Sequence, residues 1–329
     1  MKTHSPLVSI HRLKIKCPVC GKKDDCAVSD DRRRAFCRRV RSDKPGRGGW
    51  THILAPSLLP AGGRIQHAPQ PQQKQAERAG ADHIAGVLTT LLRRHLTLGE
   101  RHRAALLARG LSEGEIERNG YRSAPTPDDG DRIARGLSDF GLDGVPGFHK
   151  TGGEWRMRDF GDGIFVPIRD AQMLVVGCQI RRDEGSPRYI WFSSAGKPRG
   201  TSSGAPVHFA RPCLLHGSSE VLITEGALKA DICAHFLNQP VIAAAGVSCF
   251  GADFAAHLKA KFPNLETAYL AFDADFQHND GVKESLFRLA DELQAAGLRA
   301  QVRAWPARMG KGIDDYLLTV SKSEGRVAA

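Results

Sequence analysis

Acidic side chains follow two apolar runs in the last third of the chain, in an arrangement that can hold a metal ion. Glu225 and a glycine follow the run 221–224, and Asp273 and Asp275 follow the run 268–272. Residues two apart on an extended segment share a face, so the two aspartates can direct their carboxylates at one hard cation, with Mg²⁺ preferred over Zn²⁺. An Asp-x-Asp pair alone more often caps a loop, but together with Glu225 after an earlier strand it favours metal-dependent phosphate chemistry.

The segment 310–317 supplies a third group of polar residues, which we expect to join the acidic residues. Lys311 can neutralise a phosphate, while Asp314 can hold metal or orient Lys311. The alternative is that Asp314 or Asp315 caps the amino terminus of a helix. We favour the functional interpretation.

The elements that must position these residues alternate between strand-like and helix-like patterns. Apolar residues recur every four positions at Leu228, Ile232 and Phe236, which predicts a helix after Glu225. The remaining pattern predicts strands at 221–225, 241–245, 268–272 and 300–305, and helices at 253–261 and 282–296. Such βαβ units form a parallel sheet, whose functional crevice lies outside the carboxyl ends of the strands, so the acidic residues converge there.

Four cysteines near the amino terminus have the spacing of a metal site. Cys17 and Cys20 form a Cys-x-x-Cys knuckle, followed by Cys26 and Cys37, and the segment between the last two can fold as a hairpin. This arrangement is typical of a zinc ribbon, with free buried thiols as the alternative. Because the second ligand pair is irregular, His52 is a candidate replacement for one of the cysteines.

The chain has a net charge of +11, and +9 of it lies in the first fifty residues. Concentrated basic charge favours nucleic acid as a partner over a merely solvated surface. The candidate nucleic-acid-binding residues of this end are Arg32, Arg33, Arg34, Arg38 and Arg39.

The middle of the chain separates the two sites. A Pro- and Gln-rich stretch reads as a tether, helical periodicity follows over 83–119, and short strands follow between about 145 and 210. Basic residues that could contact phosphates in this β-rich part, or simply face solvent, are Arg181, Arg182, Lys197 and Arg199. Because 18 consecutive apolar residues and a signal peptide are both lacking, we expect no membrane partner and a cytoplasmic location.

The carboxy-terminal motifs resemble the Toprim domain of bacterial-type primases, topoisomerases and some nucleases, in the form found in primase-like plasmid and phage proteins. The resemblance covers about 216–320 and rests on Thr224–Gly226, Phe272–Asp275 and Lys311–Asp315, in the family's order. It implies that Glu225 is a general acid/base, and that Asp273 and Asp275, with a further contact from Glu225, hold magnesium. Lys311 and Asp314 match the later Lys/Asp motif.

The resemblance extends upstream, because such primases also place a zinc ribbon and a small basic β-containing lobe before the Toprim sheet. The zinc-ligand spacing departs from the usual primase pattern, and we expect no helicase-binding domain after residue 320. The expected fold is α/β, with a Rossmann-like parallel-sheet domain. Its expected parts are a zinc ribbon at 1–54, a flexible linker at 55–82, a helical and β-rich basic lobe at 83–215 and a Toprim catalytic domain at 216–329.

The leading functional hypothesis is a DNA primase of a mobile element, which makes short RNA primers on single-stranded DNA from nucleoside triphosphates. It would use structural Zn²⁺ and catalytic Mg²⁺ or Mn²⁺, with a separate replicative helicase as a possible partner. The alternatives are a metal-dependent Toprim nuclease and an inactive zinc-ribbon DNA-binding accessory protein. A topoisomerase is disfavoured because none of the four tyrosines is a convincing nucleophile, and an ATP motor because no phosphate-binding loop motif is present.

Overall fold

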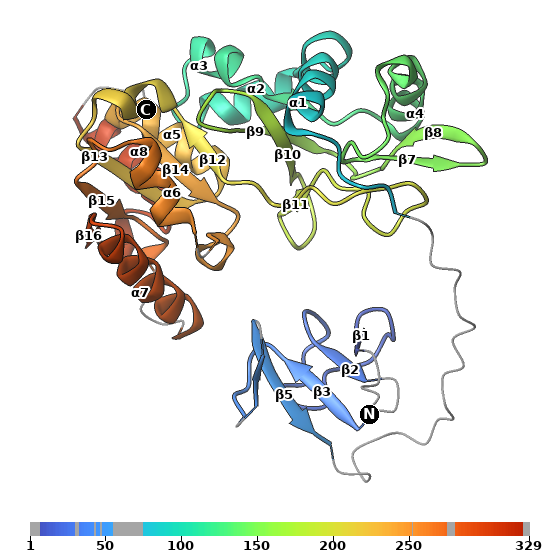
Figure 1. Ribbon diagram of the computed structural model, residues 1–329, viewed down its shortest axis with the longest axis horizontal. Coiled ribbons are helices and arrows are strands. Elements are labelled where there is room, and N and C mark those ends of the chain that lie inside the picture. Colours follow the sequence, from blue (N-terminus) through green and yellow to red (C-terminus); the bar gives the residue numbers. More distant parts are fainter. Residues whose placement is uncertain are drawn as a thin grey trace. The chain divides into compact units, whose positions relative to one another are not determined.

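The computed structural model describes residues 7–29, 33–42, 44–46, 48–54, 75–251, 253–274 and 280–324. The chain forms two compact units, Met1–Gln72 and Gln73–Ala329, each with its own core (Figure 1). Among the described helices, none is long and apolar enough to cross a membrane.

The first unit is a small antiparallel sheet. Its strands lie in the order β1-β2-β3-β5-β4, with the bounds β1 Leu7–Ser9, β2 Ala27–Ser29, β3 Arg34–Cys37, β4 Pro45–Gly46 and β5 Gly49–Ile53. Strands β2 and β3 pair at Ala27 and Phe36, which confirms the hairpin predicted between Cys26 and Cys37. The core holds few side chains besides the cysteines, chiefly Ile10, Val28 and Ala35. A core of this size needs a crosslink or a metal to be stable.

The second unit begins with helices. Their bounds are α1 Ala81–Thr90, which continues as the π-helical turn η2 Leu91–His95, then α2 Glu100–Leu107, α3 Glu113–Asn119, α4 Pro127–Gly136 and the 3₁₀ turn η3 Ser138–Phe140. Side-chain caps begin two of these helices, because Ser112 accepts a hydrogen bond from the N–H of Glu115 and Thr126 accepts one from Asp129. Helix α1 contacts β10 and buries Ile84 and Leu88 in the shared core.

An antiparallel sheet follows these helices. Its order is β11-β10-β9-β6, with the bounds β6 Arg122–Ser123, β9 Gly163–Arg169, β10 Val175–Arg182 and β11 Tyr189–Trp191, and a separate hairpin of β7 Phe148–Thr151 and β8 Glu154–Met157. Phe192 packs edge-on against Phe148 and Phe165, at ring-centroid distances of 5.6 and 5.1 Å. The strands predicted between about 145 and 210 are therefore present, and three of them, β9, β10 and β11, lie in this sheet.

The last third of the chain forms a five-stranded sheet in the order β12-β14-β13-β15-β16. The strands β13 to β16 run parallel and β12 antiparallel. Their bounds are β12 His208–Ala210, β13 Glu220–Glu225, β14 Val241–Ala244, β15 Thr267–Leu270 and β16 Arg299–Val302. The intervening helical segments are η4 Pro212–Gly217, α5 Ala227–Leu237, η5 Val247–Cys249, α6 Phe254–Lys261, α7 Asp280–Ala295, η7 Ala307–Met309 and α8 Ile313–Ser323.

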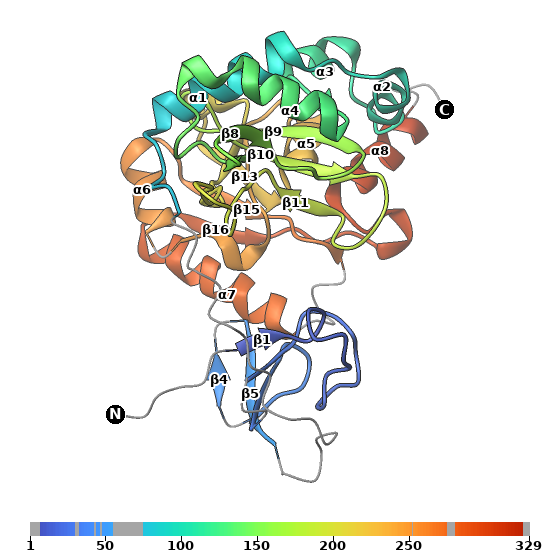
Figure 2. The ribbon, with the colours of Figure 1, turned by 90° about the vertical axis from the view of Figure 1, so that its right-hand side faces the viewer.

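Helices cover both faces of this sheet, as the run of apolar residues in its strands predicts. Val221 and Ile223 face the core formed with α6 and α7. Leu222 faces the core that includes Ala230 of α5 and Ile313 of α8. Both views show α7 beside β16 (Figures 1 and 2). The predicted parallel sheet is thus confirmed, and the carboxyl ends of its strands share one edge.

A buried polar network joins the antiparallel sheet to the parallel one. Asp231 of α5 accepts hydrogen bonds from Tyr121 Oη at 2.6 Å and from the guanidinium of Arg169 on β9. His208 Nδ1 accepts from the Arg169 backbone N–H at 3.1 Å, so its Nε2–H donates to Asp231 at 3.0 Å. Each of these four residues is hydrogen-bonded to another, although the Nε of Arg169 has no hydrogen-bond partner among the described residues. The network therefore orients the two sheets relative to each other inside the second unit.

Candidate active site and zinc centre

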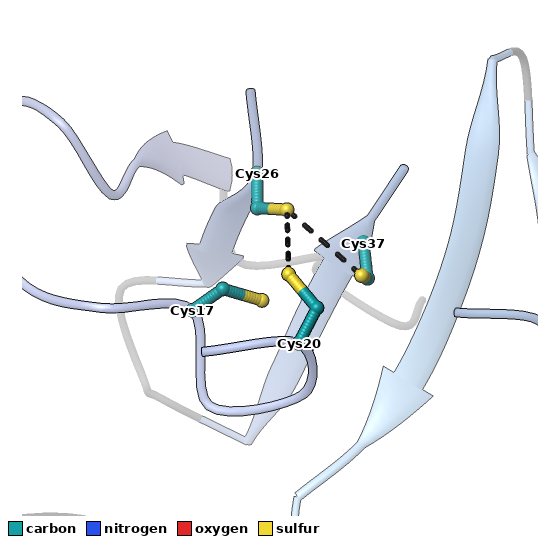
Figure 3. Close-up of side chains that lie close together, drawn as sticks. All are labelled: Cys17, Cys20, Cys26 and Cys37. Atoms are coloured by element: carbon teal, nitrogen blue, oxygen red, sulfur yellow. Dashed lines mark hydrogen bonds between the residues drawn. The ribbon is translucent and has the colours of Figure 1, made fainter. Parts of the chain in front are cut away.

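The four cysteines Cys17, Cys20, Cys26 and Cys37 converge in the first unit (Figure 3). Their sulfur atoms all lie within 4.8 Å of one another, with 3.8 Å between Cys20 and Cys26 and 3.9 Å between Cys26 and Cys37. Zinc with four thiolates at about 2.3 Å requires tetrahedral S···S separations of about 3.8 Å. The cluster therefore resembles a zinc site, and the donor set fits that ion.

Local backbone geometry builds this centre. The knuckle closes where the N–H of Gly21 donates to the carbonyl of Cys17 at 2.9 Å, and Gly21 has a φ of +71°, which favours glycine. The N–H groups of Arg39 and Val40 both donate to the sulfur of Cys37 at 3.4 Å. The alternative ligand His52 lies elsewhere, with its Nε2 at 2.9 Å from the carbonyl of Val40.

The thiols differ in acidity before metal binds. Burial opposes the ionisation of Cys20, but the backbone N–H of Lys22 and the neighbouring thiols lower its pKa to about 7. Burial raises the pKa of Cys26 to about 12. Metal must therefore displace a proton from Cys26 before that thiol can act as a ligand.

The predicted basic residues of this unit have different surroundings. Arg39 contacts Asp24 at 3.0 Å and Asp25 at 3.4 Å, and its Nη1 lies 3.8 Å from the sulfur of Cys26. Its guanidinium thus supports the turn that carries the cysteines. Arg33 and Arg38 are exposed and Arg34 is half-buried at the start of β3, whereas Arg32 lies outside the described residues.

The acidic residues of the second unit are placed by strand ends. Glu225 is the last residue of β13, and Gly226 follows it with a φ of +82°, a turn that only glycine adopts without strain. Asp273 follows β15, and the next residue, Ala274, donates its N–H to the carbonyl of Lys311 at 2.8 Å. Three of the predicted site residues, Glu225, Asp273 and Lys311, therefore lie at one edge of the sheet. The fourth, Asp275, lies outside the described residues.

A half-buried lysine that the sequence did not predict for the site lies close to both carboxylates. Lys229, one helical turn after Glu225 on α5, contacts Asp273 Oδ1 through its Nζ and lies 3.7 Å from Glu225 Oε1. Lys311 lies 3.4 Å from Asp273 Oδ2 and is 65% exposed, against 16% for Lys229. Lys229 follows Glu225 by four residues, in the first turn of the predicted helix, and this spacing was the signal in the sequence that the two side chains could meet.

The carboxylates respond oppositely to these surroundings. Burial, followed by the neighbouring Asp273 carboxylate, raises the pKa of Glu225. Burial also disfavours the charged form of Asp273, but Lys229 and then Lys311 outweigh it and lower that pKa. Burial would lower the pKa of Lys229, yet Asp273 and Glu225 raise it, so the ammonium stays charged. Asp273 is thus the carboxylate that stays ionised, and Glu225 is the one better suited to exchanging a proton.

The two aspartates of the late motif Lys311–Asp315 make different contacts. Asp314 is 3% exposed and binds the guanidinium of Arg109, which lies between α2 and α3. Asp315 accepts a hydrogen bond from the N–H of Gly312 at 3.3 Å and so caps α8. The buried carboxylate of Asp314 is therefore paired with Arg109, and the capping alternative holds for Asp315.

A cavity of about 570 Å³ opens onto these residues. The part of the chain that forms the antiparallel sheet contributes Gln179, Arg181, Arg188 and Tyr189 to its lining. Of the basic residues predicted in the β-rich lobe, Arg181 lines this cavity, and Arg188, which was not among those candidates, lines it as well. The cavity is lined by both cationic and acidic groups, which suits a ligand that carries phosphates.

The other predicted lobe residues do not line this cavity. Arg199 forms an ion pair with Asp143 on the surface. Arg182 contacts the carbonyl of Pro187 at 3.5 Å, and Lys197 is exposed.

Comparison with known families and curated proteins gives limited information. A family described as Domain of unknown function (DUF3854) matches residues 213–324, which include Glu225, Asp273 and Lys311. No curated protein matches the chain.

Solved structures give a broader match, at low sequence identity. The zinc-binding and RNA polymerase domains of the Aquifex aeolicus primase match with a TM-score of 0.55 and 18% identity, over 75% of this chain and 60% of that one. The RNA polymerase domain of Mycobacterium tuberculosis primase DnaG matches with a TM-score of 0.57 and 17% identity, over 75% and 83%. A DnaG catalytic core matches with a TM-score of 0.55 and 18% identity, over 74% and 78%. The chain is therefore similar in fold to bacterial DnaG-type primase domains and carries a cysteine cluster that resembles a zinc site.

Proposed function

We propose that the chain is a DNA primase-like nucleotidyltransferase, which makes short RNA primers on single-stranded DNA. The observation that carries the proposal is the cavity that Glu225, Asp273 and Lys311 line together with Arg181 and Arg188. Similarity to primase domains supports it, and the Mycobacterium tuberculosis domain, at 14% identity and a TM-score of 0.56, is known in complex with double-stranded DNA bearing a single-stranded overhang.

The domain assignment follows from the same reasoning. We assign a zinc ribbon to 1–54, a linker to 55–82, the basic lobe to 83–215 and a Toprim domain to 216–329. The resemblance of its motifs to primase-like proteins of plasmids and phages supports a role in the replication of a mobile element. A separate replicative helicase is the partner that such a role implies.

A divalent cation suits the oxygen donors of the acidic cluster. Glu225 and Asp273, with Asp275, would hold Mg²⁺ or Mn²⁺, because carboxylate oxygens are the ligands these ions prefer. Burial, and after it the neighbouring Asp273 carboxylate, raises the pKa of Glu225, so its ionised form carries a cost that a bound cation would relieve. The ion would supply charge neutralisation for the phosphates of the incoming nucleotide.

The chain's own residues then serve the chemical step. The 3′-hydroxyl oxygen of the primer end attacks the α-phosphorus of the incoming nucleotide, a new P–O bond forms, and pyrophosphate leaves. Glu225 accepts the hydroxyl proton, for which its raised pKa is suited. Lys311, largely exposed at the cavity rim, binds the leaving phosphates as a mobile point charge.

Basic residues of the lobe orient the nucleic acid and the nucleotide. Arg181 and Arg188 line the same cavity as Glu225, where their guanidinium groups can bind phosphate oxygens in pairs. Arg109 is held by Asp314 beside the same cavity, so its remaining N–H groups add to this lining. The exposed Arg33 and Arg38 of the zinc ribbon would contact the template backbone.

The test uses the full chain with mixed-sequence single-stranded templates, labelled ribo- or deoxyribonucleotides and Mg²⁺ or Mn²⁺, with products resolved by size. We expect short new oligoribonucleotides, and a loss of at least about 100-fold in Asp273→Asn and Glu225→Gln, as expected for removal of a proton acceptor or metal ligand. Arg199→Gln, outside the cavity, is the matched control and should retain activity.

Other product patterns would contradict the proposal in distinct ways. Shortening of the template, lost in Asp273→Asn, would show a nuclease. Tight DNA binding without turnover in either metal would show an accessory protein.

A further inference from the structure

The environment of Lys229 bears on how many metal ions the acidic site can take. Its Nζ contacts Asp273 Oδ1 and lies 3.7 Å from Glu225 Oε1, and its side chain is 16% exposed. A lysine in this place occupies the side of the Asp273 carboxylate that faces α5.

The backbone of Gly312 closes over the same ammonium group. A Cβ at residue 312 would lie 3.2 Å from Lys229 Cε, 3.3 Å from its Nζ and 2.4 Å from Asp314 Oδ1. Gly312 has a φ of −90°, so the glycine serves close approach and not backbone conformation. Lys229 is therefore held by α5, by two carboxylates and by the segment before α8.

The other oxygen of Asp273 has a different neighbour. Asp273 Oδ2 lies 3.4 Å from Nζ of Lys311, which is 65% exposed and can swing into solvent. A cation can thus reach Oδ2 by displacing Lys311, while Oδ1 stays bonded to Lys229.

This asymmetry distinguishes one-metal from two-metal chemistry. Two-metal sites place their ions about 3.5–4 Å apart, a spacing at which one carboxylate can bridge both ions through its two oxygens. Among the described carboxylates that line the cavity, Asp314 is the other buried one, and its bond to Arg109 keeps it from replacing Asp273 in that role.

We infer that Lys229 is a built-in cation that takes the place of a second divalent ion, so the site binds one divalent ion per chain. The inference concerns the site used in the proposed primase function and rests on the assignment of Glu225 and Asp273 to it. Lys229 is a positioning residue in this scheme, because it fixes Asp273 for the single ion.

The experiment counts bound Mn²⁺ on the zinc-loaded full chain by electron paramagnetic resonance. Ions at the acidic site are those that are lost in Asp273→Asn. We expect one such ion on the wild-type chain and two on Lys229→Met, which keeps the length of the side chain and removes its charge. In the matched control Lys311→Met, we expect one ion, bound severalfold more tightly because an exposed positive charge is gone.

The result that overturns the inference is two ions on the wild-type chain, a measurement that needs no variant, or one ion on both folded lysine variants. Lys229→Gln provides a second test if Lys229→Met does not fold. The proposed function fails separately, since absence of primer synthesis with the expected ion counts would overturn the primase assignment and leave this inference standing.

Discussion

The guanidinium group of Arg109 binds the carboxylate of Asp314, which is 3% exposed, although the two residues are 205 positions apart in the sequence. This pair joins the loop between α2 and α3 to the first turn of α8, and both residues line the cavity. It also gives the buried carboxylate of Asp314, within the late motif, a charged partner.

Removing one member of this pair should destabilise the second unit. In Arg109→Met, the buried Asp314 carboxylate loses its partner, and we expect a loss of about 3 kcal/mol, at the lower end for a buried charge because Arg109 is partly exposed. Urea unfolding monitored by circular dichroism measures the change. The double variant Arg109→Met/Asp314→Asn should recover most of it, and an equal loss in both variants would contradict the pairing argument.

The buried network around Asp231 predicts a loss of stability in acid. Burial disfavours the charged form of Asp231, but Arg169 and His208 outweigh it and lower its pKa to about 2. The stabilisation by this carboxylate is therefore complete above its unfolded pKa of about 4 and is lost as the pH falls toward 2.

His208 acts in the same direction at higher pH. Burial lowers its pKa, so the unfolded state takes up a proton from about pH 6.5 downward while the folded state does not, and stability falls. Unfolding midpoints measured in urea between pH 4 and 7.5 should fall with acid, and the fall should be smaller in His208→Gln. An unchanged pH dependence in that variant would show that another histidine is responsible.

Zinc should hold the first unit together. We expect one zinc per chain, and its loss in Cys26→Ser, with unfolding of 7–54 but not of 75–324, because the small core of the first unit cannot compensate for the metal. Metal analysis and limited proteolysis measure both effects. The exposed Cys213 provides the matched control, since Cys213→Ser should keep both zinc and protease resistance.

Zinc affinity should also fall in acid. The buried Cys26 thiol, with its pKa of about 12, must release its proton to bind metal. Competition with a chromophoric chelator at pH 6 and pH 8 tests this, and equal affinity at both values would contradict a thiolate site.

The cavity arginines should serve nucleotide or template binding. Arg181→Gln and Arg188→Gln each remove charge-assisted hydrogen bonds worth about 1.5–3 kcal/mol, which corresponds to weakening of about tenfold or more. We expect this in the KM for nucleotides or in the Kd for single-stranded DNA, each measured at fixed salt. Arg199→Gln should change neither, because Arg199 pairs with Asp143 outside the cavity.

The local pattern of the sequence determined the elements and the ends at which the acidic residues lie. The cysteine spacing predicted a metal site, and the cluster of Cys17, Cys20, Cys26 and Cys37 is present. Apolar periodicity predicted the βαβ order, and Glu225 and Asp273 meet at one edge because parallel strands bring their carboxyl ends together. These features depend on neighbouring residues, so sequence alone suffices for them.

Tertiary structure alone decided which side chains contact one another at the cavity and in the buried network. Periodicity predicts which face a residue occupies but not the residue it meets, so Lys229 against Asp273, Arg109 against Asp314 and Asp231 inside a buried network were not predicted. Nor did the sequence predict that Arg188 lines the same cavity as Glu225 and Asp273, because this depends on how the antiparallel and parallel sheets pack together. Buried charges take partners wherever the packing of distant elements supplies them, and that packing follows from the cores as a whole.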